Sequence, residues 1–245
     1  MWQATVRGRK LTFHLAGINN ENFIMRDEET GSWWQQVSGE AIRGPLKGER
    51  LIEVPHDELT FATWTREQPG GRVLRPDPAV LEAKRYASAE WEEKTAKAPV
   101  VTVLPADDPF PGRELVVGVT MGSASRAYPL AALRAERLIM DVLDGVPIAL
   151  VIAEDGRSVR AFDRRIDDRV IDLFIVPDVS PLQLLDAGSG STLDFTGSGT
   201  SGSLLGRSLR RVAILQDYWF DWRTYHPDTQ AYTFTSAPTS ALPAP

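Results

Sequence analysis

The chain contains 245 residues, of which 42% are hydrophobic and 24% are charged, so collagen-like, coiled-coil and wholly disordered classes are excluded. Its 33 acidic and 27 basic residues give a net charge of −6, which leaves no basic surplus for a nucleic acid or an anionic membrane surface. The absence of cysteine excludes disulfides, thiolate nucleophiles and thiolate-bound zinc or iron–sulfur sites.

Strands are predicted wherever short runs of β-forming residues stand between Gly, Pro, Asn and Asp residues. In chain order the predicted strands cover residues 11–16, 22–26, 32–36, 50–54, 100–104, 115–120, 148–153, 158–162, 170–176 and 191–195. Helices are predicted from about Asp57, over residues 78–97, over residues 129–137 and from about Asp217. The second of these helices has Asp77 as a typical N-cap and Pro78 at its first position. The pattern predicts an α+β fold that is rich in β-strands.

The apolar runs of the sequence are too short to cross a membrane. The longest, residues 146–153, falls far below the ~20 apolar residues that a membrane-spanning helix needs. The amino end has no apolar segment typical of a signal peptide, so a cytoplasmic location is expected. The carboxyl end, residues 233–245, is rich in Pro, Ala and Ser and is predicted to be a loosely held tail.

Two stretches of the chain resemble each other: the residues from Asp27 align with those from Asp186 when one residue near Val37 is left unpaired. The matched pairs are Gly31 with Gly190, Ser32 with Ser191, Gly39 with Gly197, Gly44 with Gly202, Leu46 with Leu204, Gly48 with Gly206, Leu51 with Leu209, Val54 with Val212, Trp64 with Trp222 and Pro69 with Pro227. Shared glycines indicate shared backbone turns, and a shared tryptophan indicates a shared buried anchor. The sequence therefore predicts an internal repeat.

The second copy is preceded by a segment that the first copy lacks. Residues 116–162 are predicted to form a strand, a helix and two strands joined by a turn at residues 154–156. The first copy is therefore expected to be incomplete: either the chain begins late, or the first unit completes its sheet with strands from the second. The predicted organisation is two related β-sheet or barrel-like units that pack together: a first repeat unit over residues 1–76, a linker helix and Pro-rich connection over 77–114, a second repeat unit over 115–232, and a tail over 233–245.

The first copy also carries a long motif of glycines, an aromatic residue and amides. It reads Asp27-x-x-Thr30-x-Ser32-x-Trp34-x-Gln36-x-x-Gly39-x-Ala41-x-x-Gly44-Pro45-Leu46-x-Gly48. This motif resembles the signature of the DUF3179 family, a bacterial and archaeal domain of unknown function. The run Ala127-Tyr128-Pro129-Leu130 and the pair Asp163-Arg164 resemble the amino-terminal half of that family, while Ala153-Glu154-Asp155-Gly156 stands where the family usually carries a cysteine. The resemblance implies a tandem pair of family domains, of which the first lacks its amino-terminal half.

The polar residues of the first copy form the candidate ligand-binding site: Asp27, Thr30, Ser32, Trp34, Gln36 and Glu40. Ser32, Trp34 and Gln36 share one face of a predicted strand, because side chains alternate along a strand. A hydroxyl, an indole and an amide on one face can stack on and hydrogen-bond a small polar molecule such as a sugar. The alternative is that Trp34 lies in the core, Gln36 binds a loop carbonyl, and Asp27 with Thr30 forms an Asx-type turn. The second copy has Ser189, Leu193, Phe195, Ser198 and Ser203 at the corresponding places, so it is expected to act as support.

The leading functional interpretation is a non-catalytic binding or scaffolding domain that recognises a small polar molecule or a segment of a protein partner. The alternative is a hydrolase or transferase that uses Asp27 with Ser32 or Thr30, which requires a base beside the hydroxyl. A second alternative is a purely structural subunit. The three histidines, His14, His56 and His226, form no paired metal motif, so neither a metal site nor a cofactor is expected.

Overall fold

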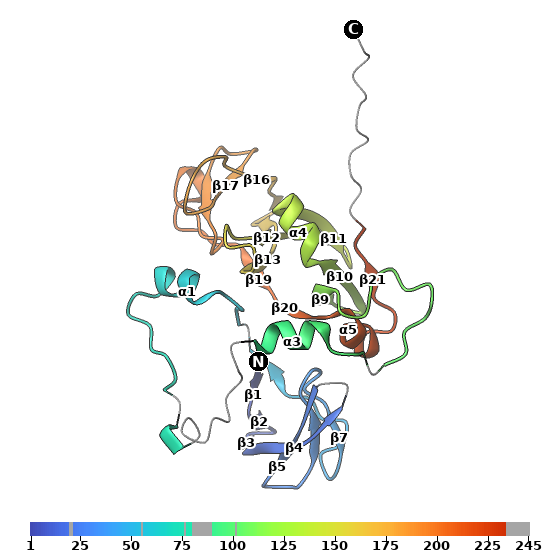
Figure 1. The fold of residues 1–245 in the computed structure, drawn as a ribbon. Coiled ribbons are helices and arrows are strands. Elements are labelled where there is room, and N and C mark those ends of the chain that lie inside the picture. Colours follow the sequence, from blue (N-terminus) through green and yellow to red (C-terminus); the bar gives the residue numbers. More distant parts are fainter. Residues whose placement is uncertain (20–21, 55, 76, 80–89, 101, 234–245) are drawn as a thin grey trace. The chain divides into compact units, whose positions relative to one another are not determined.

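The computed structural model describes residues 1–19, 22–54, 56–75, 77–79, 90–100 and 102–233 (Figure 1). The chain divides into two compact units. Unit 1 consists of Met1–Glu114, Arg157–Val159 and Tyr218–Pro227, and unit 2 consists of Leu115–Gly156, Arg160–Asp217 and Asp228–Pro245. Strands predominate and form several open sheets rather than a closed barrel among the described residues, which confirms the predicted α+β, β-rich class.

The strands of unit 1 form a small hairpin, an antiparallel meander and a pair made by the first and last strands. They are β1 (Trp2–Gln3), β2 (Thr5–Val6), β3 (Arg9–Lys10), β4 (Phe13–Asn19), β5 (Asn22–Asp27), β6 (Trp33–Gln35), β7 (Ala41–Arg43) and β8 (Ile52–Glu53). Strands β4, β5, β6 and β7 form one sheet in chain order, β2 pairs with β3, and β1 pairs with β8. Short connections between neighbouring strands make this antiparallel order the natural one.

The helices of unit 1 whose bounds lie within the described residues are α1 (Phe61–Glu67), α3 (Trp91–Lys97) and α5 (Trp219–Tyr225). Helix α1 begins later than the predicted start near Asp57, because the Thr60 hydroxyl caps the backbone N–H of Thr63 at 3.3 Å. Helix α3 is the end of the helix predicted over residues 78–97, whose middle, residues 80–89, lies outside the described residues. No described helix has the length and apolar character needed to cross a membrane.

Unit 2 contains two four-stranded sheets and smaller sheets beside them. Its elements are β9 (Leu115–Met121), β10 (Ala124–Pro129), α4 (Leu130–Glu136), β11 (Leu138–Leu143), β12 (Val146–Ile152), β13 (Val159–Asp163), β14 (Arg165–Ile166), β15 (Arg169–Val170), β16 (Leu173–Ile175), β17 (Gln183–Asp186), β18 (Thr192–Asp194), the short 3₁₀ helix η1 (Gly202–Leu204), β19 (Arg210–Val212), β20 (Ile214–Tyr218) and β21 (Gln230–Ala231). The sheet orders are β20-β9-β10-β21, β11-β12-β13-β19, β16-β17-β18 and β14-β15.

Two predicted strands differ from the structure by more than a shift of their ends. The strand predicted over residues 100–104 is wrong: the described residues of this run are irregular and lie between Pro99 and Pro105, which cannot donate to a strand ladder. The strand predicted over 170–176 is two strands, β15 and β16, with Ile171 and Asp172 between them. The predicted tail beyond Thr233 lies outside the described residues.

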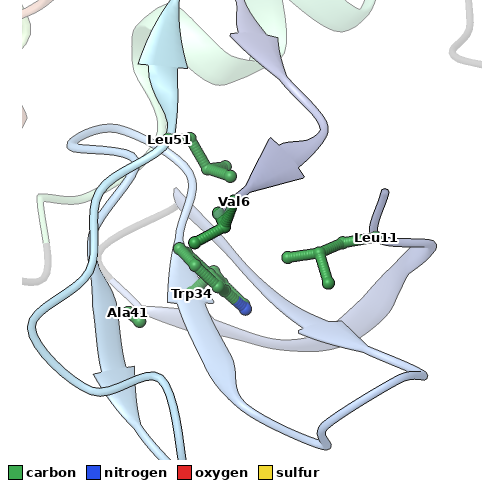
Figure 2. Close-up of a cluster of buried hydrophobic side chains, with 5 residues drawn as sticks. All are labelled: Val6, Leu11, Trp34, Ala41 and Leu51. Atoms are coloured by element: carbon green, nitrogen blue, oxygen red, sulfur yellow. The ribbon is translucent and has the colours of Figure 1, made fainter. Parts of the chain in front are cut away.

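The core of unit 1 gathers around one tryptophan. Val6, Leu11, Trp34, Ala41 and Leu51 are all buried there, and Figure 2 shows the side chains of Val6 and Leu11 pointing toward the Trp34 indole. Phe13 meets the same indole edge-on, with ring centroids 5.8 Å apart. Trp34 has no exposed surface, so it anchors the meander from its centre.

Candidate functional site

Asp27, the last residue of β5, is a carboxylate with no exposed surface. Its Oδ1 accepts the backbone N–H of Thr30 at 2.5 Å and the Thr30 hydroxyl at 2.7 Å. Its Oδ2 accepts the indole N–H of Trp34 at 2.7 Å. The turn itself closes through the Gly31 N–H, which donates to the Asp27 carbonyl at 3.0 Å, and Gly31 has a φ of 70°. The carboxylate therefore forms an Asx-type turn and is hydrogen-bonded at both oxygens.

Ser32 extends this network to a second loop. Its hydroxyl lies 2.7 Å from the Thr30 hydroxyl and accepts the Leu46 backbone N–H at 3.1 Å. Gly44 approaches so closely that a Cβ there would lie 2.7 Å from Ser32 Cα, and its φ is 100°. Only glycine allows this approach, so the loop at 44–46 is tied to the turn at 27–32.

Hydrogen bonding keeps Asp27 charged. Burial raises the pKa of Asp27, but the hydrogen bonds from Trp34 and from the side chain and backbone of Thr30 outweigh burial and hold the pKa below its ordinary value. A carboxylate with a lowered pKa is a weaker base than an ordinary aspartate. The network therefore favours a fixed negative charge over proton transfer.

Gln36 and Glu40 lie outside this network. Strand β6 ends at Gln35, so the alternation that grouped Gln36 with Ser32 and Trp34 does not reach it, and its side chain is exposed. Glu40 is half-buried and forms an ion pair with Arg50 at 2.6 Å. Four of the six predicted site residues are thus brought together, and these two are not.

A family model described as "Protein of unknown function (DUF3179)" matches residues 1–229. The chain belongs to this family. No curated protein and no solved structure matches the sequence significantly. The match confirms the family that the motif around Asp27 indicated, and it extends over both units of this DUF3179 protein.

The three histidines of this DUF3179 protein lie apart from Asp27. His14 stands opposite Arg26 in the β4–β5 pair, whereas the neighbouring Phe13 stands opposite Asp27, so His14 lies on the other face of the sheet. His56 Nδ1 is 3.2 Å from the Met1 amino group. Burial lowers the pKa of His226, whose ring stacks on Trp222 at a centroid distance of 3.7 Å. Within the described residues, no three His, Asp or Glu side chains are placed to hold a metal ion.

Unit 2 contains a network of the same pattern. Asp186 is 1% exposed, and its Oδ2 accepts the Ser189 backbone N–H at 3.1 Å and the Ser189 hydroxyl at 2.6 Å. Ser191 accepts the Leu204 N–H at 3.2 Å. A Cβ at Gly202 would lie 2.9 Å from Ser191 Cα. Both units thus contain a turn closed by a buried aspartate, a serine hydroxyl that accepts a backbone N–H from a second loop, and a glycine that packs against that serine.

The two networks differ at the position of Trp34. Unit 2 has Leu193, fully buried, where the alignment places Trp34. Asp186 therefore receives no indole N–H. Its further partners are the backbone N–H groups of Gly188 at 3.3 Å and of Asp172 at 3.2 Å, and the Arg169 guanidinium, which forms an ion pair with it at 3.6 Å. The indole bond distinguishes the first network from the second.

Sequence reasoning missed a polar cluster in unit 2 around Asp141. Tyr128, a fully buried side chain, donates its hydroxyl to Asp141 at 2.7 Å, and Arg126 forms an ion pair with the same carboxylate. Burial and the bond to Asp141 raise the pKa of Tyr128. A single carboxylate inside the apolar strand Leu138–Leu143 was the signal that such a partner exists, because a buried charge needs one.

Proposed function

We propose that this DUF3179 protein is a non-catalytic scaffolding domain that binds a segment of a protein partner, and that the Asp27 network serves to hold unit 1 together. The observation that supports the structural role of this network is the burial of Asp27, Ser32 and Trp34, each with no exposed surface. A small ligand could contact these atoms only if Trp34 left the core. Removing a buried tryptophan from a core costs about 3–5 kcal/mol, which a small polar molecule would have to supply on binding.

We also propose that residues 1–76 and residues 115–232 are copies of one ancestral unit, joined by residues 77–114. The networks of Asp27 and Asp186 support this. So do the two helices that follow them: α1 and α5 each end at a residue with nearly the same dihedral angles, φ −126° and ψ 66° at Gln68 and φ −128° and ψ 68° at His226. The copies differ in the Trp34 indole, which stabilises only the first network.

The hydrolase or transferase alternative has less support. A nucleophilic hydroxyl needs a base within hydrogen-bond reach. The side-chain groups that contact the hydroxyls of Thr30 and Ser32 are each other and Asp27, whose lowered pKa makes it a weak base. Recognition of a small polar ligand would use the partly or fully exposed members of the predicted site, Thr30, Gln36 and Glu40.

A matched pair of serine variants tests the scaffolding role. Ser32→Ala and Ser191→Ala each remove a buried hydroxyl that ties two loops, so both should lower the unfolding temperature. A thermal-shift screen against a broad metabolite set should then give the same ligand-induced shifts for the wild type and for Ser32→Ala. A metabolite that stabilises the wild type but not Ser32→Ala would overturn the scaffolding role and favour a ligand site at Ser32.

A further inference from the structure

Strand β1 is paired along one edge. Trp2 stands opposite Glu53 and Gln3 opposite Ile52 in β8, and the Val54 N–H donates to the Met1 carbonyl at 2.9 Å. Backbone groups of alternate residues point to opposite edges of an antiparallel strand. The amide groups of Trp2 and Ala4 therefore point away from β8. Over the described ranges, no strand pairs with this outer edge of β1.

Strand β13 of unit 2 is the counterpart of β1. Phe162 and Asp163 stand opposite Arg211 and Arg210 in β19, as Trp2 and Gln3 stand opposite two residues of β8. The Ile171 N–H donates to the Arg164 carbonyl at 2.9 Å, the distance at which the Leu11 N–H donates to the Ala4 carbonyl.

The aromatic rings of these two strands also pack alike. The Trp2 ring lies against Gly39, where a Cβ would meet it at 2.8 Å. The Phe162 ring lies against Gly197, where a Cβ would meet it at 2.5 Å. Register, hydrogen bonds and packing thus all assign β1 to the place that β13 holds in unit 2.

The two strands differ in what covers them. Strand β13 lies between β19 and β12, and the Arg164 N–H donates to the Pro147 carbonyl at 2.8 Å. The counterpart of this donor in unit 1 is the Ala4 N–H, on the outer edge of β1. Strand β12 therefore supplies in unit 2 the partner that β1 lacks among the described residues.

Side-chain exposure follows the same difference. Met1 is 66% exposed and Val54 is 36% exposed, whereas their counterparts Ala161 and Val212 are 0% and 8% exposed. Trp2 is half-buried, and its counterpart Phe162 is fully buried. Unit 1 therefore leaves apolar surface uncovered at the positions that unit 2 buries.

We propose that the outer edge of β1 binds an extended, uncharged apolar strand from a separate polypeptide by β-augmentation. The proposal rests on the proposed repeat, and it names the chemistry of the partner segment. The occupant resembles β12, whose residues Ile148–Ile152 are at most 1% exposed. Strand β12 itself is already paired with β11 and β13, so it is not available. A second copy of β1 would offer Trp2–Gln3, which lacks the continuous apolar run of β12.

The direction of the bound strand also follows from unit 2. Pro147, near the start of β12, bonds to the residue after the end of β13, and a short turn joins Ile152 to Val159. Strands β12 and β13 are therefore antiparallel. The bound strand should therefore run antiparallel to β1. Every second residue of the bound strand should hydrogen-bond the backbone groups that Trp2 and Ala4 present at the outer edge.

A peptide with the sequence of residues 145–153, carrying two added carboxyl-terminal lysines, is the probe. Titrated into the full chain, it should slow hydrogen exchange at the Trp2 and Ala4 amides at least tenfold, as measured by NMR. Failure to bind, or protection confined to other amides, would overturn the proposal. Protection of Trp2 and Ala4 that rises with protein concentration and without peptide would show a second copy as the occupant and would also overturn it.

Two N-methylated peptides make the test specific for one strand edge. Ala149 and Val151 share the edge of Pro147, which faces β13 in unit 2, so methylating their amides should weaken binding at least tenfold. Methylating Ile148 and Leu150, on the opposite edge, should leave the affinity within threefold. Equal affinities would overturn the strand-pairing geometry. If the peptide fails to bind while the serine variants behave as expected, the edge proposal alone is lost.

Discussion

The hydrogen bond between Trp34 and Asp27 can be measured with a double-mutant cycle. Trp34→Phe keeps an aromatic ring in the core but removes the indole N–H, which lies 2.7 Å from Asp27 Oδ2. Asp27→Asn keeps the size of the side chain but removes the charge and one acceptor oxygen. Trp34→Phe removes the donor and Asp27→Asn removes the charge of the acceptor, so the energy of this charge-assisted bond is lost only once in the double variant.

The expected magnitudes follow from burial and charge. A hydrogen bond to a charged group contributes about 1.5–3 kcal/mol, and the smaller ring of phenylalanine leaves a cavity that adds about 1 kcal/mol. Trp34→Phe should therefore lower the free energy of unfolding by roughly 3 kcal/mol. Asp27→Asn should cost a similar amount, because Asp27 has no exposed surface from which water could replace the lost bonds. The two losses together should exceed the loss in the double variant by about 1.5 kcal/mol.

Urea denaturation followed by circular dichroism and tryptophan fluorescence gives the four free energies. Trp33→Phe is the matched control: this half-buried indole has the Arg43 guanidinium 5.9 Å from its ring centre, and its replacement should cost less than about 1 kcal/mol. A coupling energy between Asp27 and Trp34 of less than about 0.3 kcal/mol would refute the reasoning, because the indole N–H would then add nothing to the buried carboxylate.

The backbone and pH provide further predictions. Gly44→Ala should lower the free energy of unfolding by roughly 2–4 kcal/mol, because the new Cβ would lie 2.7 Å from Ser32 Cα at a φ of 100°. Gly48→Ala, with a φ of 89° but no atom within 4 Å, is the control and should cost only about 1 kcal/mol in urea denaturation. Asp163 is buried, which raises its pKa, but hydrogen bonds from two arginine side chains and a backbone N–H lower its pKa to about 2. A pKa that is lowered from 3.8 in the unfolded chain to about 2 in the folded protein contributes ~2 kcal/mol to the free energy of unfolding. This contribution is present above about pH 4 and is lost as the pH falls toward 2. Asp163→Asn should flatten the urea midpoint over that pH range, and an unchanged pH profile would contradict the assignment.

The strands that could be predicted from the sequence are those whose residues decide the conformation locally. The predicted strands at 22–26 and 115–120 match β5 and β9 to within one residue at each end, because β-branched and aromatic residues stand between turn-forming ones. The run at 100–104 has similar composition but forms no strand in its described part, because an apolar run becomes a strand only where a neighbour supplies the ladder.

In the candidate site, too, contacts between residues close in sequence could be predicted, whereas contacts that depend on strand register could not. The turn of Asp27 and Thr30 joins residues three apart, so the sequence pattern alone predicts it. The bonds from Trp34 to Asp27 and from Leu46 to Ser32 depend on strand register and on where β6 ends, which no local pattern fixes. For this reason the sequence predicted the Asx turn as one of two alternatives but could not decide whether Trp34 lies in the core or binds a ligand.

The spacing of the Asp27 contacts also sets the order in which unit 1 can fold. The bond to Thr30 closes a loop of three residues, that from Trp34 closes seven, and that from Leu46 to Ser32 closes fourteen. Short loops close first because they lose the least chain entropy, and the Asp27 carboxylate is still hydrated when the turn forms. As Trp34 packs, its indole N–H adds a further hydrogen bond to the carboxylate that is being taken out of water. The turn is therefore expected to form early, while Asp27 is still hydrated, and the packing of Trp34 is expected to be the later step that buries the carboxylate.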